Sequence, residues 1–101
     1  PISYDEIVRS LRPYGKLRMV VLSGFFQHHW DSRLDILIIG DKLYEQEVAH
    51  EITILESYLG RELRYTCLST EEYRYRVSIQ DRLIRDVFDY EHEIIFDRME
   101  V

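Results

Sequence analysis

The feature that most constrains this chain is a short run that is apolar on both sides, Leu34-Asp35-Ile36-Leu37-Ile38-Ile39. A half-buried strand alternates apolar and polar residues, whereas this run carries a single polar residue, Asp35. Strands that are apolar on both faces belong in the middle of a covered sheet. We therefore expect residues 33–39 to form a central strand that ends at Gly40-Asp41.

Length and composition restrict the class of protein. The chain has 101 residues, of which 46% are hydrophobic, so we expect one domain over residues 1–101 with a substantial core. A net charge of −6 makes direct nucleic-acid binding an unfavourable hypothesis. The single cysteine, Cys67, excludes an intramolecular disulfide and favours a reducing, cytoplasmic location. No apolar run is long enough to span a bilayer, so no membrane partner is expected.

Capping and periodicity predict the elements around the central strand. The capping-box spacing of Ser3 and Glu6 predicts a first helix, which Pro13 and Gly15 end. Asp41 is predicted to cap a long helix that ends near Leu59. The remaining expected elements are strands over residues 17–22, 61–68 and 93–97, and helices over residues 69–77 and 78–90, with an apolar face on the long helix at Val48, Ile52, Leu55 and Leu59.

These elements define the expected fold class. It is α/β (α+β), with a small mixed β-sheet of three to four strands and helices packed on it. The order is helix, strand, strand, helix, strand, helix, helix and a possible final strand. A loop joins the first two strands and a helical crossover leads to the third, which makes the sheet mixed.

Three segments carry a resemblance to a known family. They are Ser23-Gly24, then Ser32-Arg33-Leu34-Asp35-Ile36-Leu37-Ile38-Ile39-Gly40, and finally Gly60-Arg61-Glu62-Leu63-Arg64-Tyr65-Thr66. Together with the order of elements they resemble minimal nucleotidyltransferases of the polymerase-β-like superfamily, over residues 16–97. In that family a Gly-Ser turn follows the first strand, and an Asp-x-Asp motif opens the second.

The resemblance implies a specific site and also its loss. In the family, three carboxylates bind two divalent cations that hold a triphosphate, and the glycine turn approaches the phosphates. Here Asp35 keeps one acidic position, Arg33 and Arg64 stand at the other two, and Ser23-Gly24 is the inverted turn. One carboxylate between two guanidinium groups is expected to pair with them instead of a metal.

Two hypotheses for these residues stay open at this point. In one, Arg33, Asp35 and Arg64 form an ion-pair cluster in place of the metal site, with no confident catalytic residue, no metal and no cofactor. In the other, Ser23, Gly24, Arg33 and Arg64 form a residual anion or nucleotide site that works without metal.

The resemblance therefore implies a non-catalytic nucleotidyltransferase-like domain that acts as a regulatory or protein-interaction module. The alternative is an active, Mg²⁺-dependent nucleotidyltransferase that uses Asp35 with carboxylates such as Asp31, Glu62 or Glu71. A small domain of this kind is expected to form a homodimer, and a further protein partner is a possibility that the sequence leaves open.

Other groups of residues favour structural interpretations. His28 and His29 with Asp31 and Asp35 contain metal-ligating types, but adjacent histidines diverge, so a solvated loop is expected. Phe25, Phe26 and Trp30 are expected either to cover a core or to meet another chain. The tyrosines and arginines of 72–76 fall on a predicted helix and favour core and surface positions over base stacking. Cys67 lacks an activating neighbour.

Overall fold

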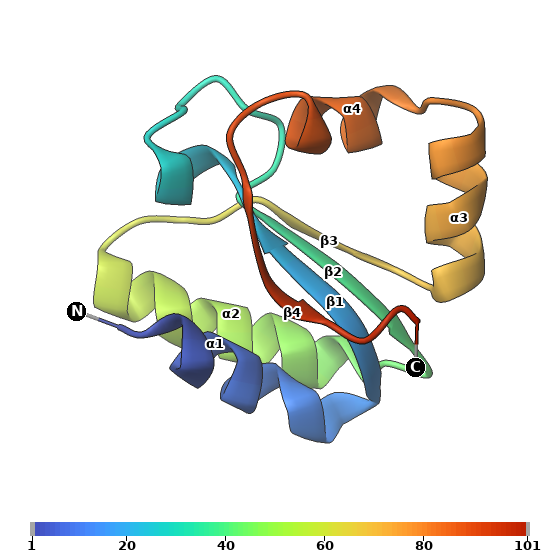
Figure 1. The fold of residues 1–101 in the computed structure, drawn as a ribbon. Coiled ribbons are helices and arrows are strands. Elements are labelled where there is room, and N and C mark those ends of the chain that lie inside the picture. Colours follow the sequence, from blue (N-terminus) through green and yellow to red (C-terminus); the bar gives the residue numbers. More distant parts are fainter. Residues whose placement is uncertain (1, 101) are drawn as a thin grey trace.

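The computed structural model describes residues 2–100, which fold into a four-stranded mixed sheet and four α-helices (Figure 1). The strand order is β3-β2-β1-β4. The elements are α1 Tyr4–Leu11, β1 Lys16–Leu22, β2 Ile36–Asp41, α2 Glu45–Leu59, β3 Tyr65–Leu68, α3 Thr70–Ser78, α4 Arg82–Phe88 and β4 Glu93–Asp97, with 3-10 turns at Arg12–Tyr14 and Gly24–Gln27. The expected fold class and order of elements are confirmed.

The central strand is internal, as its composition predicts, but its bounds differ from the expected 33–39: β2 begins at Ile36 and continues through Gly40 and Asp41, which pair with β1. β2 pairs antiparallel with β1, through partners such as Val20 and Ile38, and parallel with β3. β4 pairs antiparallel with the other side of β1. The side chains of Ile36, Leu37, Ile38 and Ile39 are all 0% exposed, because helices cover both faces of the sheet. The apolar run thus indicated correctly that its strand is internal.

Helices α1 and α2 lie side by side across one face of the sheet (Figure 1). The expected capping box at Ser3 and Glu6 is present, with both of its reciprocal hydrogen bonds. Gly60 ends α2 in a left-handed conformation, which glycine adopts without steric cost. Val48, Ile52 and Leu55 are buried on the inner side of α2, as its periodicity predicts, while Leu59 is partly buried.

Helices α3 and α4 cover the opposite face. Ile84 and Val87 of α4 are buried against β1 and β2, whereas α3 has no fully buried residue. The predicted helix over residues 78–90 begins only at Arg82, because Asp81 accepts the first N–H groups of α4 as its cap. Ser69 caps α3 as expected, although Glu72 pairs with Arg76 instead of completing a box.

Two further boundaries differ from the sequence-based expectation. Asp41 does not cap α2: it is the last residue of β2, and its carboxylate accepts hydrogen bonds from the N–H and hydroxyl of Thr70. Helix α2 starts at Glu45 without a side-chain cap, after the left-handed turn at Lys42. Strand β3 starts at Tyr65 and not at residue 61, because side-chain carboxylates and not a strand partner accept the N–H groups of Leu63 and Arg64.

None of the helices described between residues 2 and 100 combines the length and apolar character needed to cross a membrane.

Candidate functional site

The candidate site lies where β1 ends, β2 begins and the chain enters β3. At its centre is Asp35, whose side chain is 0% exposed. The N–H of Phe25 donates to its Oδ1 at 2.8 Å, and the N–H of Arg64 donates to its Oδ2 at 2.8 Å. Arg64 Nη2 lies 3.4 Å from Oδ1. Since burying a carboxylate is costly unless its oxygens are paired, these bonds explain how Asp35 is accommodated in the core.

The main chain around Asp35 completes the same junction. The N–H of Asp35 donates to the Arg64 carbonyl at 2.8 Å, and the N–H of Ser23 donates to the Asp35 carbonyl at 2.9 Å. Asp35 therefore ties together three segments that are separated in sequence. Its carboxylate holds the turn after β1 and the start of β3 in fixed positions on either side of β2.

The turn Ser23-Gly24 is folded against Asp35. Ser23 is 1% exposed, and its hydroxyl donates to the Leu34 carbonyl at 2.8 Å. Gly24 has a φ of 51°, and a Cβ added there would lie 2.3 Å from Asp35 Oδ1. Glycine is thus required for a close backbone approach, as the family motif implies, but in this structure the backbone approaches the Asp35 carboxylate.

The two arginines occupy different environments. Arg64 makes the ion pair expected with Asp35, and its side chain stays 46% exposed. Arg33 is exposed, and its main-chain N–H donates to Asp86 Oδ2 of α4 at 2.7 Å. Within residues 2–100, the ion pairs of Asp35 include Arg64 but not Arg33, so the expected three-residue cluster is reduced to a pair. Arg33 lies just before the buried run, and its contact with α4 is made by its main chain.

The carboxylates required by the active alternative do not gather around Asp35. Asp31, Glu62 and Glu71 are all exposed. In the part of the chain from residue 2 to residue 100, no three His, Cys, Asp or Glu side chains lie close enough to share a metal ion. His28 packs edge-on against Trp30, and His29 packs edge-on against Tyr90, with ring centroids 6.0 and 5.1 Å apart.

The aromatic residues of the loop after β1 lie in different environments: two pack on the core and one is exposed. Phe25 and Phe26 are half-buried and pack against the core under α1 and α2. Trp30 is 57% exposed. The guanidinium of Arg61 lies 4.7 Å above the Phe25 ring centroid and 5.9 Å from that of Trp30, within the range of cation–π attraction. Arg61 was not expected here, because nothing local in the sequence relates it to residues 25–30.

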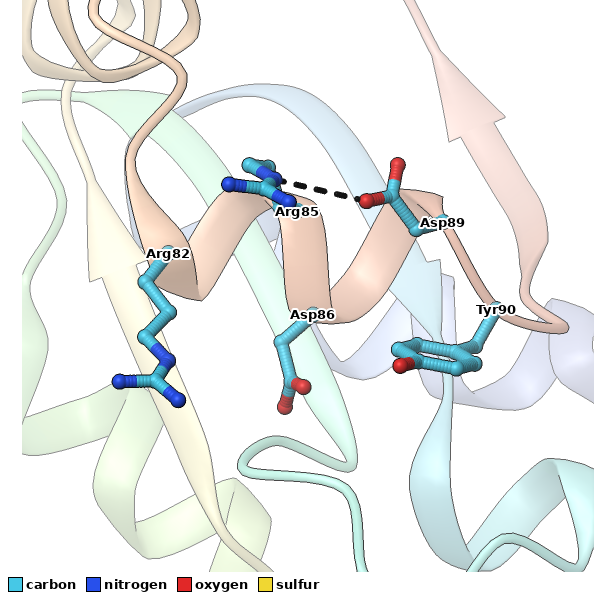
Figure 2. A pocket seen from close by; sticks show the side chains of 5 residues that line it. All are labelled: Arg82, Arg85, Asp86, Asp89 and Tyr90. Carbon is cyan, nitrogen blue, oxygen red and sulfur yellow. Dashed lines mark ion pairs between the residues drawn. The ribbon is translucent and has the colours of Figure 1, made fainter.

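A cavity of about 440 Å³ lies along α4, lined by Arg82, Arg85, Asp86, Asp89 and Tyr90. Figure 2 shows Arg82 and Asp86 projecting from one side of α4, with Tyr90 from the following segment on the same side, while Arg85 and Asp89 pair with each other on another. Its lining does not include Ser23, Gly24, Arg33, Asp35 or Arg64, the residues compared above with the nucleotidyltransferase motif. Asp86 accepts a hydrogen bond from the Arg33 N–H, so the cavity lies beside the contact between α4 and the loop that contains Arg33.

The sole cysteine lies apart from this chemistry. Burial raises the pKa of the Cys67 thiol to about 11, and the nearby Glu45 contributes in the same direction. The reactive form of cysteine is the thiolate, which is a small fraction at neutral pH when the pKa is this high. Cys67 therefore belongs to the core, in agreement with its apolar setting in the sequence.

Comparison of the chain with protein-family models, with curated proteins and with solved structures finds no match in any of the three. The resemblance to nucleotidyltransferases therefore stays a prediction from the residues, and the functional argument depends on the geometry around Asp35.

Proposed function

We propose that this chain is a non-catalytic nucleotidyltransferase-like domain that acts as a regulatory or protein-interaction module. The observation that carries the proposal is the state of Asp35, the one carboxylate that the motif retains. Its side chain is fully buried, and its two oxygens accept hydrogen bonds from Phe25 and Arg64. A metal at Asp35 would have to reach a side chain that is 0% exposed and would meet the guanidinium of Arg64 beside Oδ1, whose positive charge opposes a cation.

The charge around the motif supports the same proposal. A Mg²⁺ ion and a triphosphate need several hard oxygen ligands at one place. Arg33 and Arg64 stand at two of the positions where the family has acidic residues. Asp31, Glu62 and Glu71 are exposed, and among residues 2–100 no group of three metal-ligating side chains is found that could serve the active alternative. Binding to another protein is the role that we propose in place of catalysis.

Calorimetry tests whether the chain binds nucleotides with a metal, which the active alternative requires. The chain is titrated with ATP, GTP, CTP and UTP, with and without Mg²⁺, and no Mg²⁺-dependent heat of binding is expected. Micromolar binding that requires Mg²⁺, is lost in Asp35→Asn and persists in Glu93→Gln would contradict the non-catalytic proposal and favour the active alternative. Glu93 is a suitable control because it is an exposed carboxylate on β4. Circular dichroism confirms that each variant is folded.

The same titrations examine the residual anion site. Ser23 is buried and its hydroxyl is engaged, so an anion would have to be held by the exposed side chains of Arg33 and Arg64. Metal-independent nucleotide binding that is lost in Arg33→Ala would support such a site. If nucleotides produce no heat under any condition, the interaction module stands without a ligand site.

The proposal includes a homodimer and a cytoplasmic location. Tyr75 and Ile79, four residues apart at the end of α3, are 58 and 54% exposed, which provides an apolar surface for a second copy. Helix α3 carries Glu71 and Glu72 before Arg74 and Arg76, so two antiparallel α3 helices would place opposite charges together. Sedimentation analysis is expected to give a dimer that Ile79→Glu converts to a monomer; an unchanged mass would contradict it.

A further inference from the structure

We propose that the groove between α1 and α2 is a docking site for a basic amphipathic helix of a partner protein. This inference rests on the interaction-module function proposed above and specifies the partner. It concerns the face of the molecule opposite α3 and α4, and it uses none of the residues of the nucleotidyltransferase-like motif.

The groove is lined mainly by apolar side chains, together with Glu6, Ser10 and Glu51. Two adjoining cavities of about 160 and 210 Å³ share the lining residues Ile2, Glu6 and Tyr58. The first extends to Ile54 and Leu55, and the second reaches the end of α2. Because the two cavities share these lining residues, they adjoin between α1 and α2, two helices that Figure 1 shows side by side.

Two large side chains of α2 are exposed and do not belong to the buried core. Tyr58 is 78% exposed and Ile54 is 41% exposed. They are four residues apart, so they lie on the same side of the helix. The inner face of α2 is already buried through other residues. Large apolar side chains next to an apolar groove are typical of a surface that another protein covers.

The charge of this face determines what can cover it. Helices α1 and α2 together contain six carboxylates and one arginine, which accounts for five of the six net negative charges of the chain. Helix α2 contains four glutamates and no lysine or arginine. Glu6 and Glu51 line the groove itself. A partner with lysine or arginine beside its apolar residues is therefore electrostatically complementary.

The same charge disfavours a second copy as the occupant. Packing one α1–α2 face against another would bring glutamates of both copies together, which opposes association. A helix fits the groove because its apolar residues recur at three- and four-residue spacing, and such a row can occupy a depression between two parallel ridges. Helix α2 has 15 residues, so a partner helix of similar length would be about 22 Å long.

A pair of designed peptides tests this inference. Both are fluorescent helical peptides with the length of α2 and leucines at i, i+3, i+4 and i+7; the flanking positions are lysine in one and glutamate in the other. Fluorescence anisotropy is expected to detect binding of the lysine peptide only. Tyr58→Ala and Glu51→Lys should each weaken it about tenfold. Tyr75→Ala is the matched control on α3, where the tyrosine is 58% exposed, and should leave binding unchanged.

Several results would overturn the inference. They are the absence of binding, equal binding of both peptides, and equal effects of Tyr58→Ala and Tyr75→Ala. A dimer that Tyr58→Ala dissociates in sedimentation would assign the groove to a second copy. These outcomes are separate from the test of catalysis: Mg²⁺-dependent nucleotide binding would contradict the non-catalytic function, whereas a failed peptide titration would contradict only the assignment of the groove.

Discussion

The two faces of the sheet are covered by helices of different kinds. On one face, α1 and α2 pack on a cluster of twelve buried residues; on the other, α3 and α4 pack on a cluster of eight. Helix α2 buries Val48, Ile52 and Leu55, while α3 buries no residue completely. The first face therefore supplies more of the hydrophobic stabilisation, which scales with the apolar area removed from water.

The faces also differ in charge and in how their helices are attached. The α1–α2 face holds most of the net negative charge. Helix α3 is attached at its start by polar contacts, in which Thr70 donates two hydrogen bonds to Asp41 of β2. This difference shows that the helices on the two sides of a small sheet can be held differently: α2 by fully buried side chains, and α3 by hydrogen bonds to Asp41 and the partly buried Tyr73.

The largest expected effect compares one buried side chain from α2 with one exposed side chain from α3. Ile52 is 3% exposed, and Ile52→Ala should lower the free energy of unfolding by about 3–4 kcal/mol through the cavity it creates. Val77 is 45% exposed, and Val77→Ala should change it by less than about 0.5 kcal/mol. Urea denaturation measures both. Similar losses in the two variants would show that the faces contribute equally.

The next largest loss of stability is expected at Asp35, whose carboxylate joins segments of the sheet that lies between the two pairs of helices. Asp35→Ala leaves the N–H groups of Phe25 and Arg64 without an acceptor and should cost about 2–4 kcal/mol. Arg64→Ala removes only a half-exposed ion pair and should cost about 1 kcal/mol or less. Chemical denaturation of the two variants compares the main-chain bonds with the guanidinium. A larger loss from Arg64→Ala would contradict this division.

Native-state hydrogen exchange compares the local stability of α2 with that of α3 in the unmutated protein. Local opening of a helix with few buried contacts requires less free energy than opening of one that belongs to the main core. The amides of α3 should therefore exchange through openings about 2 kcal/mol smaller in free energy than those of α2. Equal protection of the two helices would indicate that α3 is held by more than its contacts to Asp41 and the sheet.

The smallest expected effect depends on pH. Hydrogen bonds from the Thr70 main chain and hydroxyl lower the pKa of Asp41 below its ordinary value of 3.8. The stabilisation is therefore complete above pH 3.8 and is lost as the pH falls through the lowered pKa of the folded state. Asp41→Asn should cost about 1 kcal/mol at pH 7, and this difference should shrink in acid. Glu91→Gln, at an exposed position, is the control.

Several elements could be predicted from sequence because their determinants are local. The apolar run before Gly40 indicated an internal strand, and the spacing of Ser3 and Glu6 indicated a capped helix. Helix α2 was predictable from the repeat of Val48, Ile52 and Leu55. In each case the residues that decide the structure lie within a few positions of one another, so a periodic pattern or a cap contains the necessary information.

The errors occurred where a side chain has two competing partners. Asp41 has the residue type and position of a helix cap, but in the structure it accepts hydrogen bonds from Thr70, 29 residues later. The start of β3 was placed too early because the partner of the Leu63 N–H is Glu56 of the preceding helix. A local pattern cannot distinguish such partners, since the choice depends on which segments the fold brings together.

Sequence alone determined that this chain has a central strand, helices packed on a mixed sheet, and one acidic residue, Asp35, in a run that is otherwise apolar. Only the tertiary structure decided what Asp35 contacts. Its carboxylate meets the Phe25 and Arg64 N–H groups because β1 ends and β3 begins at the same end of β2, one on each side of that strand. The physical reason is burial: a carboxylate that is 0% exposed must be paired, and its partners come from distant segments.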